Sequence, residues 1–180
     1  MKKLLFFIPL TIWAVTITSC SSNDDYMGII EEKKLFSFSS DGSSVVPSTR
    51  IPKNVFLDFA KGKVWSEEEV YEIFDDGTLS THHLFEGMYM ETPYFEFMEK
   101  ETITYTHAVG QITRATEYDE DGNKLIVDGK ERYTLLSING EEMKIATKYI
   151  SIKDEGNDTI NVLCILHRVF TGTISEWLKQ

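Results

Sequence analysis

Four histidines carry the side chains best suited to metal binding or acid–base chemistry in this chain: His82, His83, His107 and His167. His82 and His83 are neighbours, so on a strand their side chains point to opposite faces and cannot line one site together. The sequence contains no H-E-x-x-H, C-x-x-C, Walker or Gly-x-Ser-x-Gly motif that would give a histidine, cysteine or serine a catalytic context. We therefore expect no metal, no cofactor and no enzymatic activity, with a hydrolase of unrecognised type as the enzymatic alternative.

Acidic side chains are numerous, with 29 Asp and Glu against 18 Lys and Arg and a net charge of −11. This balance argues against nucleic acid as a partner, since phosphate contacts need clustered Lys and Arg. Residues 119–123 (DEDGN) place oxygen ligands at alternate positions, but Lys124 and Lys130 stand where a calcium-binding loop requires Gly and Glu. We interpret this segment and residues 154–158 as hairpin turns, and the run at residues 67–69 (EEE) as a solvated face.

The chain has two cysteines, too few for a disulfide framework. Cys164 lies within an apolar run, residues 162–166 (VLCIL), and is expected to be a buried thiol that packs as a small hydrophobe. Cys20 differs because it follows a basic start and an apolar run at residues 4–17. That run is shorter than the ~20 residues needed to span a bilayer, so residues 1–19 are interpreted as a secretory signal peptide.

Residues 17–20 (ITSC), at the end of this signal, resemble the lipobox of bacterial lipoproteins. In those proteins the cysteine is acylated and becomes the mature N-terminus, so the resemblance implies that Cys20 carries a lipid such as palmitate that anchors the chain to a membrane. Residues 21–25 (SSNDD) are similar to the surface-export signal of Bacteroidota lipoproteins. The expected location is therefore the cell envelope, as an outer-membrane lipoprotein exposed at the surface. The alternatives are an ordinary cleaved signal and a solvated tether.

The mature chain divides into a polar part and a folded part. Residues 20–50 are polar and rich in serine, and we expect a tether there, with one short strand at Leu35–Phe38. Removing residues 1–50 is accordingly expected to leave a folded domain, residues 51–180.

From Trp65 onward, short β-favouring runs are separated by turn signals, of which Asn139-Gly140 is the strongest. This regular spacing is typical of an antiparallel β-barrel or a β-sandwich, and the alternation of polar and apolar residues supports strands with one wet face. Short helices are expected at Asn54–Ala60 and Ser175–Gln180. The nine expected strands are residues 65–74, 78–85, 94–98, 102–107, 112–118, 124–127, 131–138, 143–153 and 159–170.

A family resemblance rests on three segments of this region. Residues 59–65 (FAKGKVW) look like the helical turn that leads into Gly and Trp at the start of lipocalin-like domains, and residues 71–78 (YEIFDDGT) look like their first hairpin. Residues 165–169 (ILHRV) look like the closing strand. The chain thus resembles the small lipocalin-like (calycin) lipoproteins of Bacteroidota over about residues 55–170. The resemblance implies an all-β, antiparallel barrel of about eight or nine strands in which Arg168 packs over Trp65; the alternative is a β-sandwich.

An eight-stranded barrel has room for side chains or for one small ligand. Apolarity on alternating positions leads us to expect Phe97, Tyr105 and Tyr133 to point inwards and to line any pocket. We therefore predict a membrane-anchored, non-catalytic domain that binds a small apolar or amphipathic ligand or a partner protein.

Residues 84–95 (LFEGMYMETPYF) mix methionine and aromatic residues around Gly87 and Pro93. They are consistent either with a strand that packs in the core or with an adaptable lid over a barrel mouth. The alternative function is an accessory, glycan-binding β-sandwich in which exposed Trp65, Tyr89 or Tyr94 stacks on sugar rings.

Overall fold

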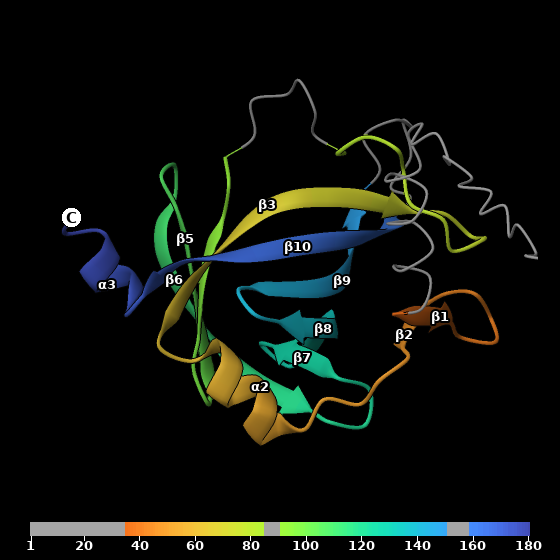
Figure 1. Cartoon of the computed structure of the whole chain (residues 1–180), viewed down its shortest axis with the longest axis horizontal. Helices are drawn as coiled ribbons and strands as arrows, with labels where there is room; N and C mark the ends of the chain where they lie inside the picture. The colour runs from red at the N-terminus through yellow and green to blue at the C-terminus, as the bar shows by residue number, and fades with distance from the viewer. Residues whose placement is uncertain (1–34, 85–90, 151–158) are drawn as a thin grey trace, which may run out of the picture.

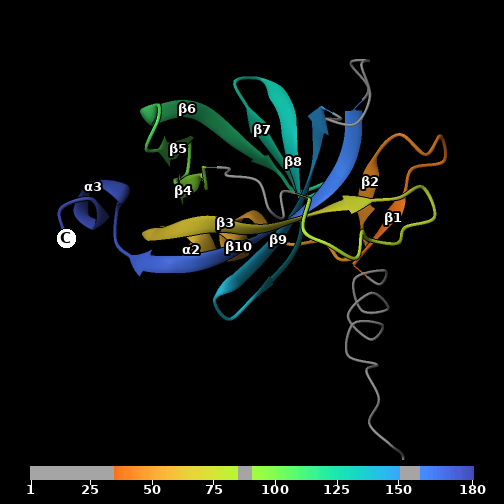
Figure 2. The same ribbon diagram turned by 90° about the horizontal axis from the view of Figure 1, so that it is seen from above.

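The computed structural model describes residues 35–84, 91–150 and 159–180, and within them eight antiparallel strands form a closed barrel (Figures 1 and 2). The order around the barrel follows the chain from β3 to β10, and β10 pairs with β3 to close it. The predicted antiparallel barrel is confirmed, and closure excludes the alternative sandwich. The strands are β3 Lys63–Ile73, β4 Tyr94–Phe97, β5 Glu101–Thr106, β6 Gly110–Asp119, β7 Lys124–Val127, β8 Lys130–Asn139, β9 Glu142–Ile150 and β10 Thr159–Thr171.

The signal peptide expected at residues 1–19, Cys20 and the export-like residues 21–25 lie outside the described ranges. Among the helices that are described, none is both long and apolar enough to cross a membrane.

Local turn chemistry explains the simple up-and-down order of the strands. Asp128 and Gly129 connect β7 to β8 in two residues, with φ values of 52° and 74°. Positive φ at both positions matches the right-handed twist of the flanking strands, and Asp-Gly tolerates it at little cost. The turn expected at Asn139-Gly140 lies one residue later, since Asn139 ends β8 opposite Glu142, and Gly140 and Glu141 connect β8 to β9.

One of the nine expected strands is not formed. Residues 78–84, the described part of the expected strand 78–85, meet β3 through scattered contacts: an isolated bridge joins Leu79 to Ile73, and the Leu84 amide donates to the Val70 carbonyl over 2.6 Å. The next strand in the barrel after β3 is β4, which pairs with the first part of β3 and places Phe95 opposite Trp65. β4 pairs with residues 64–66 of β3, whereas residues 78–84 meet its residues 70–73 without forming a ladder, so β-favouring composition alone did not make a strand here.

A β-hairpin precedes the barrel and packs on its outer surface, made of β1 Phe36–Phe38 and β2 Val45–Pro47. Phe36 is 5% exposed, and with Val45 it joins a core cluster that includes Leu136 and Leu163 of the barrel. The short strand expected at residues 35–38 is present. The second half of the range expected to be a tether thus carries structure that is packed against the domain.

The serines of this hairpin build its turn rather than a flexible linker. The Asp41 carboxylate accepts hydrogen bonds from the Ser39 hydroxyl (2.6 Å) and from the Ser43 amide (3.0 Å) and hydroxyl (2.9 Å). These bonds lower the pKa of Asp41 to about 2, the Ser39 hydroxyl contributing most. Short polar side chains that bond to a nearby backbone favour turns, which explains the composition of the segment.

Helix α2 (Lys53–Ala60) closes one end of the barrel (Figure 1). Its Phe56 is buried between the rings of Phe97, 5.7 Å away, and Tyr118, 4.8 Å away. Trp65, which is fully buried, donates its indole N–H to the Ala60 carbonyl over 3.1 Å. The first barrel strand is thereby fixed to the end of the helix.

The second expected helix is α3 (Ile174–Trp177), which lies outside the barrel near the C-terminus (Figure 1). Thr173 and Glu176 form a reciprocal capping box at its start. The Ile174 amide also donates to the Glu96 carboxylate over 2.8 Å, which fixes the helix to β4.

The expected contact of Arg168 with Trp65 is not formed. The two residues are opposite each other across β10 and β3, but the guanidinium of Arg168 pairs with the carboxylate of Glu141 in the β8–β9 turn. The cation near the Trp65 ring is Lys63, with its Nζ 6.0 Å from the ring centroid. A carboxylate within reach offers an arginine a charge-assisted hydrogen bond, which exceeds the attraction of an aromatic face.

Candidate functional site

A cavity of about 720 Å³ opens at the barrel end farther from α2. The volume is within the range of small-molecule sites. Its walls are largely apolar and come from strands far apart in the sequence. The lining includes Val70 of β3, Tyr149 and Ile150 of β9, Ile160 of β10, and Leu84 and Pro93 of the β3–β4 connection.

Glu67 lies at the inner end of this cavity, next to the packed core. Glu67 is 8% exposed, and one of its carboxylate oxygens accepts a hydrogen bond from the Tyr149 hydroxyl over 2.9 Å. The same hydroxyl lies 3.9 Å from the fully buried thiol of Cys164. β3, β9 and β10 thus each contribute one polar side chain to a cluster inside an apolar barrel, which we call the Glu67 cluster.

A β-bulge turns the Glu67 side chain inwards. On β3, Glu69 is opposite Ile165 while Glu67 is opposite the next residue of β10, Leu166, so Glu68 is an extra residue between them. Because side chains alternate between faces, the extra residue allows Glu67 and Val70 to face inwards together. Without the bulge, residues 67 and 70 would lie on opposite faces.

Burial controls the protonation of the cluster. Desolvation raises the pKa of the Glu67 carboxyl, and the hydrogen bonds from Tyr149 and Cys164, with the nearby His83, offset only part of this effect. Desolvation and the nearby Glu67 charge raise the pKa of Tyr133 to about 12 and also raise the pKa of the Cys164 thiol. Cys164 is therefore a protonated, buried cysteine, as its apolar sequence context predicts, and not an activated nucleophile.

The structure separates the three residues expected to line a pocket. Tyr133 is half-buried inside the barrel and lines a smaller cavity of about 250 Å³. Phe97 is 2% exposed and lies in the solid part of the core, against Phe56 and Phe95. Tyr105 differs from expectation, because its ring lies on the outside of the barrel, 6.2 Å from that of Trp177 in α3.

Period-two alternation on β5 was correct, but the inward face was assigned to the wrong set of residues. Thr102 and Thr104 point inwards and line the smaller cavity with Tyr133, although Ile103 and Tyr105 are more apolar. Within the described residues, the Thr102 hydroxyl is buried without a hydrogen-bond partner. The outer set is covered partly by α3, a contact between segments more than seventy residues apart in the chain.

Aromatic side chains form a second group on the outer face of β4 and β5. The rings of Tyr94 and Trp177 are 4.3 Å apart, and Tyr105 and His107 extend the group. Of the residues named for glycan stacking, Trp65 is fully buried and cannot reach a sugar, Tyr94 belongs to this outer group, and Tyr89 lies outside the described residues.

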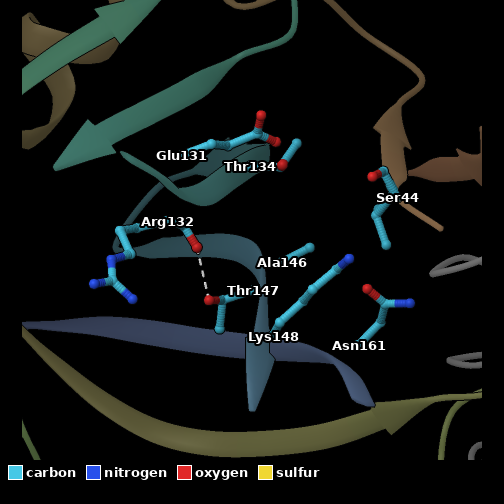
Figure 3. A pocket seen from close by; sticks show the side chains of 9 residues that line it. Ser44, Glu131, Arg132, Thr134, Ala146, Thr147, Lys148 and Asn161 are labelled. Atoms are coloured by element: carbon cyan, nitrogen blue, oxygen red, sulfur yellow. Dashed lines mark hydrogen bonds between the residues drawn. The ribbon is translucent and has the colours of Figure 1, made fainter. Parts of the chain in front are cut away.

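A polar groove of about 280 Å³ separates the β1–β2 hairpin from the barrel wall (Figure 3). Arg132 and Lys148 border both this groove and the mouth of the main cavity. In Figure 3 the Thr147 hydroxyl donates to the Arg132 carbonyl, over 2.7 Å, which joins β9 to β8 at this point. The two cationic side chains, Arg132 and Lys148, therefore lie at the rim of the main cavity, where it adjoins the groove.

Sequence reasoning did not identify Glu67, because a run of three glutamates is typical of a solvated face. The signal that could have found it is its position two residues after Trp65, which shares its inward face. In the described parts of the chain, no group of three or more His, Cys, Asp or Glu side chains is arranged to hold a metal ion. Comparison with protein-family models, with curated proteins and with solved structures finds no match to this chain.

Proposed function

We propose that this protein is a membrane-anchored, lipocalin-like lipoprotein that binds a small amphipathic molecule in its barrel cavity, without catalysis. The observation that carries the proposal is the 720 Å³ cavity, which combines apolar walls with the polar Glu67 cluster at its inner end. An apolar pocket with a few convergent polar groups is the usual form of a small-molecule site. A closed barrel of eight strands supplies such a pocket without exposing any strand edge.

A cavity-filling substitution tests this function. Ile160 of β10 lines the cavity, so Ile160→Trp should occupy part of it and weaken binding of the neutral fluorescent amphipath N-phenyl-1-naphthylamine by about tenfold or more. Val169→Trp is the matched control, since it makes a similar change on the same strand at a position that is 41% exposed. Absence of probe binding to the parent protein, or equal affinity in the two variants, would contradict cavity binding.

The proposed anchor rests on the lipobox-like residues 17–20 and the signal-like run before them. Acyl chains on Cys20 would hold the barrel at a membrane, because each buried methylene contributes about 0.8 kcal/mol. Cells that express the full chain with labelled palmitate should label the parent protein and not the Cys20→Ala variant. Equal labelling of both proteins would refute the anchor but leave the cavity function intact.

Glycan binding is the alternative function. Its support is the outer aromatic group, in which Tyr94 and Trp177 are half-buried side chains that could stack on a sugar ring. Retention of the protein on immobilised glycans, lost in Trp177→Ala and kept in Ile160→Trp, would favour this alternative over cavity binding.

A further inference from the structure

We propose that the Glu67 carboxylate recognises a cationic amine, so that the barrel cavity prefers amphipathic amines to fatty acids and to neutral amphipaths. The inference deepens the proposed function and rests on it, because it names the chemical class of ligand that the cavity would take.

The first support is that the Glu67 carboxylate is buried without a direct ion pair among the described residues. Within the described chain, no ion pair joins Glu67 to a lysine, arginine or histidine, although the residue is only 8% exposed. Its hydrogen bonds come from neutral groups, the Tyr149 hydroxyl at 2.9 Å and the Cys164 thiol. An ionised carboxylate can accept about four hydrogen bonds, so part of its acceptor capacity is left for a ligand. Desolvation is the largest effect on this acid and raises the pKa of its carboxyl, and the nearby His83 offsets only part of that rise.

The second support is the distribution of charge along the cavity. The charged and titratable side chains that line it are Glu67, Glu68, Glu91, His83, Arg132, Lys148 and Tyr149. Arg132 and Lys148 are exposed and lie at the rim, which they share with the outer groove. The Glu91 carboxylate is already engaged by the Ala108 amide over 2.6 Å. Glu67 is thus the acid at the inner end, and the positive side chains are at the mouth.

This arrangement discriminates between head groups. An ammonium group that reaches Glu67 would form a charge-assisted hydrogen bond with the carboxylate in a site largely screened from water. A carboxylate in the same position would place two negative charges side by side, which is unfavourable. A neutral alcohol would gain a hydrogen bond without the attraction between charges. The net charge of −11 also favours the approach of cations to the molecule.

Three ligands with the same tail provide the test: decylamine, decanol and decanoate. Each is titrated near neutral pH against the exported chain, residues 20–180 with Cys20→Ser, which keeps every described residue. We expect decylamine to bind at least about tenfold more tightly than decanol, and decanoate to bind most weakly.

Glu67→Gln keeps the shape of the side chain and its capacity to accept from Tyr149 but removes the charge. In this variant decylamine and decanol should bind with equal affinity, and decanoate should bind more tightly than to the parent. Glu117→Gln, an exposed position on β6, is the matched control and should preserve the parental order.

The outcomes separate the inference from the function on which it rests. If all three ligands bind alike and Glu67→Gln leaves the order unchanged, the amine preference is wrong while cavity binding stands. The same holds if decanoate binds most tightly, since its head would then lie at the Arg132 and Lys148 rim. If none of the three binds, both the inference and cavity binding are wrong.

Discussion

Asn123 connects the segment before α2 to the barrel, and its replacement should destabilise the fold. The side chain is fully buried in the turn between β6 and β7. Its Oδ1 accepts from the Ile51 amide over 2.8 Å, and its Nδ2 donates to the carbonyls of Thr49 (2.6 Å) and Leu135 (3.0 Å). One amide side chain thus joins the β6–β7 turn both to the segment before α2 and to β8.

The expected magnitude follows from these contacts and from the backbone. Asn123→Ala removes three hydrogen bonds, each with a net contribution of about 1 kcal/mol, and leaves the Ile51 amide buried without its acceptor. Asn123 also has a φ of 51°, a left-handed conformation that costs alanine roughly 1 kcal/mol more than glycine. We expect Asn123→Ala to lower the free energy of unfolding by about 4–5 kcal/mol and Asn123→Gly by about 3 kcal/mol.

Urea denaturation followed by tryptophan fluorescence measures these changes, because Trp65 is buried in the folded barrel. The control is Asn139→Ala, at the exposed end of β8, where the loss should be about 0.5 kcal/mol or less. A loss under about 1 kcal/mol for Asn123→Ala would refute the reasoning. Equal losses for the alanine and glycine variants would refute only the part assigned to backbone conformation.

Three further predictions follow from the cavity, the outer face of the barrel and the hairpin. Glu67→Gln should raise the free energy of unfolding near neutral pH by about 1.4 kcal/mol for each unit by which burial raises the carboxyl pKa. The folded protein binds this proton more tightly than the unfolded chain does, so the gain should shrink as the pH falls towards the usual glutamate pKa of 4.5, and a pH-independent gain would contradict the assignment. Tyr105→Ala should leave the affinity for N-phenyl-1-naphthylamine unchanged, because the Tyr105 ring lies outside the barrel. A loss of affinity in a variant with an unchanged melting temperature would contradict this outward placement of the ring. A chain starting at residue 51 should be less stable than one starting at residue 35 by at least about 3–5 kcal/mol, the cost of losing one buried phenylalanine such as Phe36, whereas equal melting temperatures would support the tether that the sequence predicts.

The sequence by itself determined the fold class, most of the strands and the turns between them. Eight of the nine expected strands are present, and both helices lie close to their expected positions. These features are local, since hydrophobic alternation and residues such as Asp128-Gly129 act within a few positions of the chain. The buried state of Cys164 was predictable for the same reason, because apolar residues surround it in sequence.

The tertiary structure alone decided which face of a strand points inwards and where the cavity lies. Alternation divides a strand into two sets of side chains but does not say which set faces the core. The sequence therefore predicted that Tyr105 points inwards, whereas in the structure Thr102 and Thr104 of β5 do so. The position of Glu67 depends on a bulge opposite β10, a strand nearly one hundred residues away in the chain, and the packed hairpin depends on the outer wall of the barrel. These features arise from pairing and burial between distant segments, which no local pattern encodes.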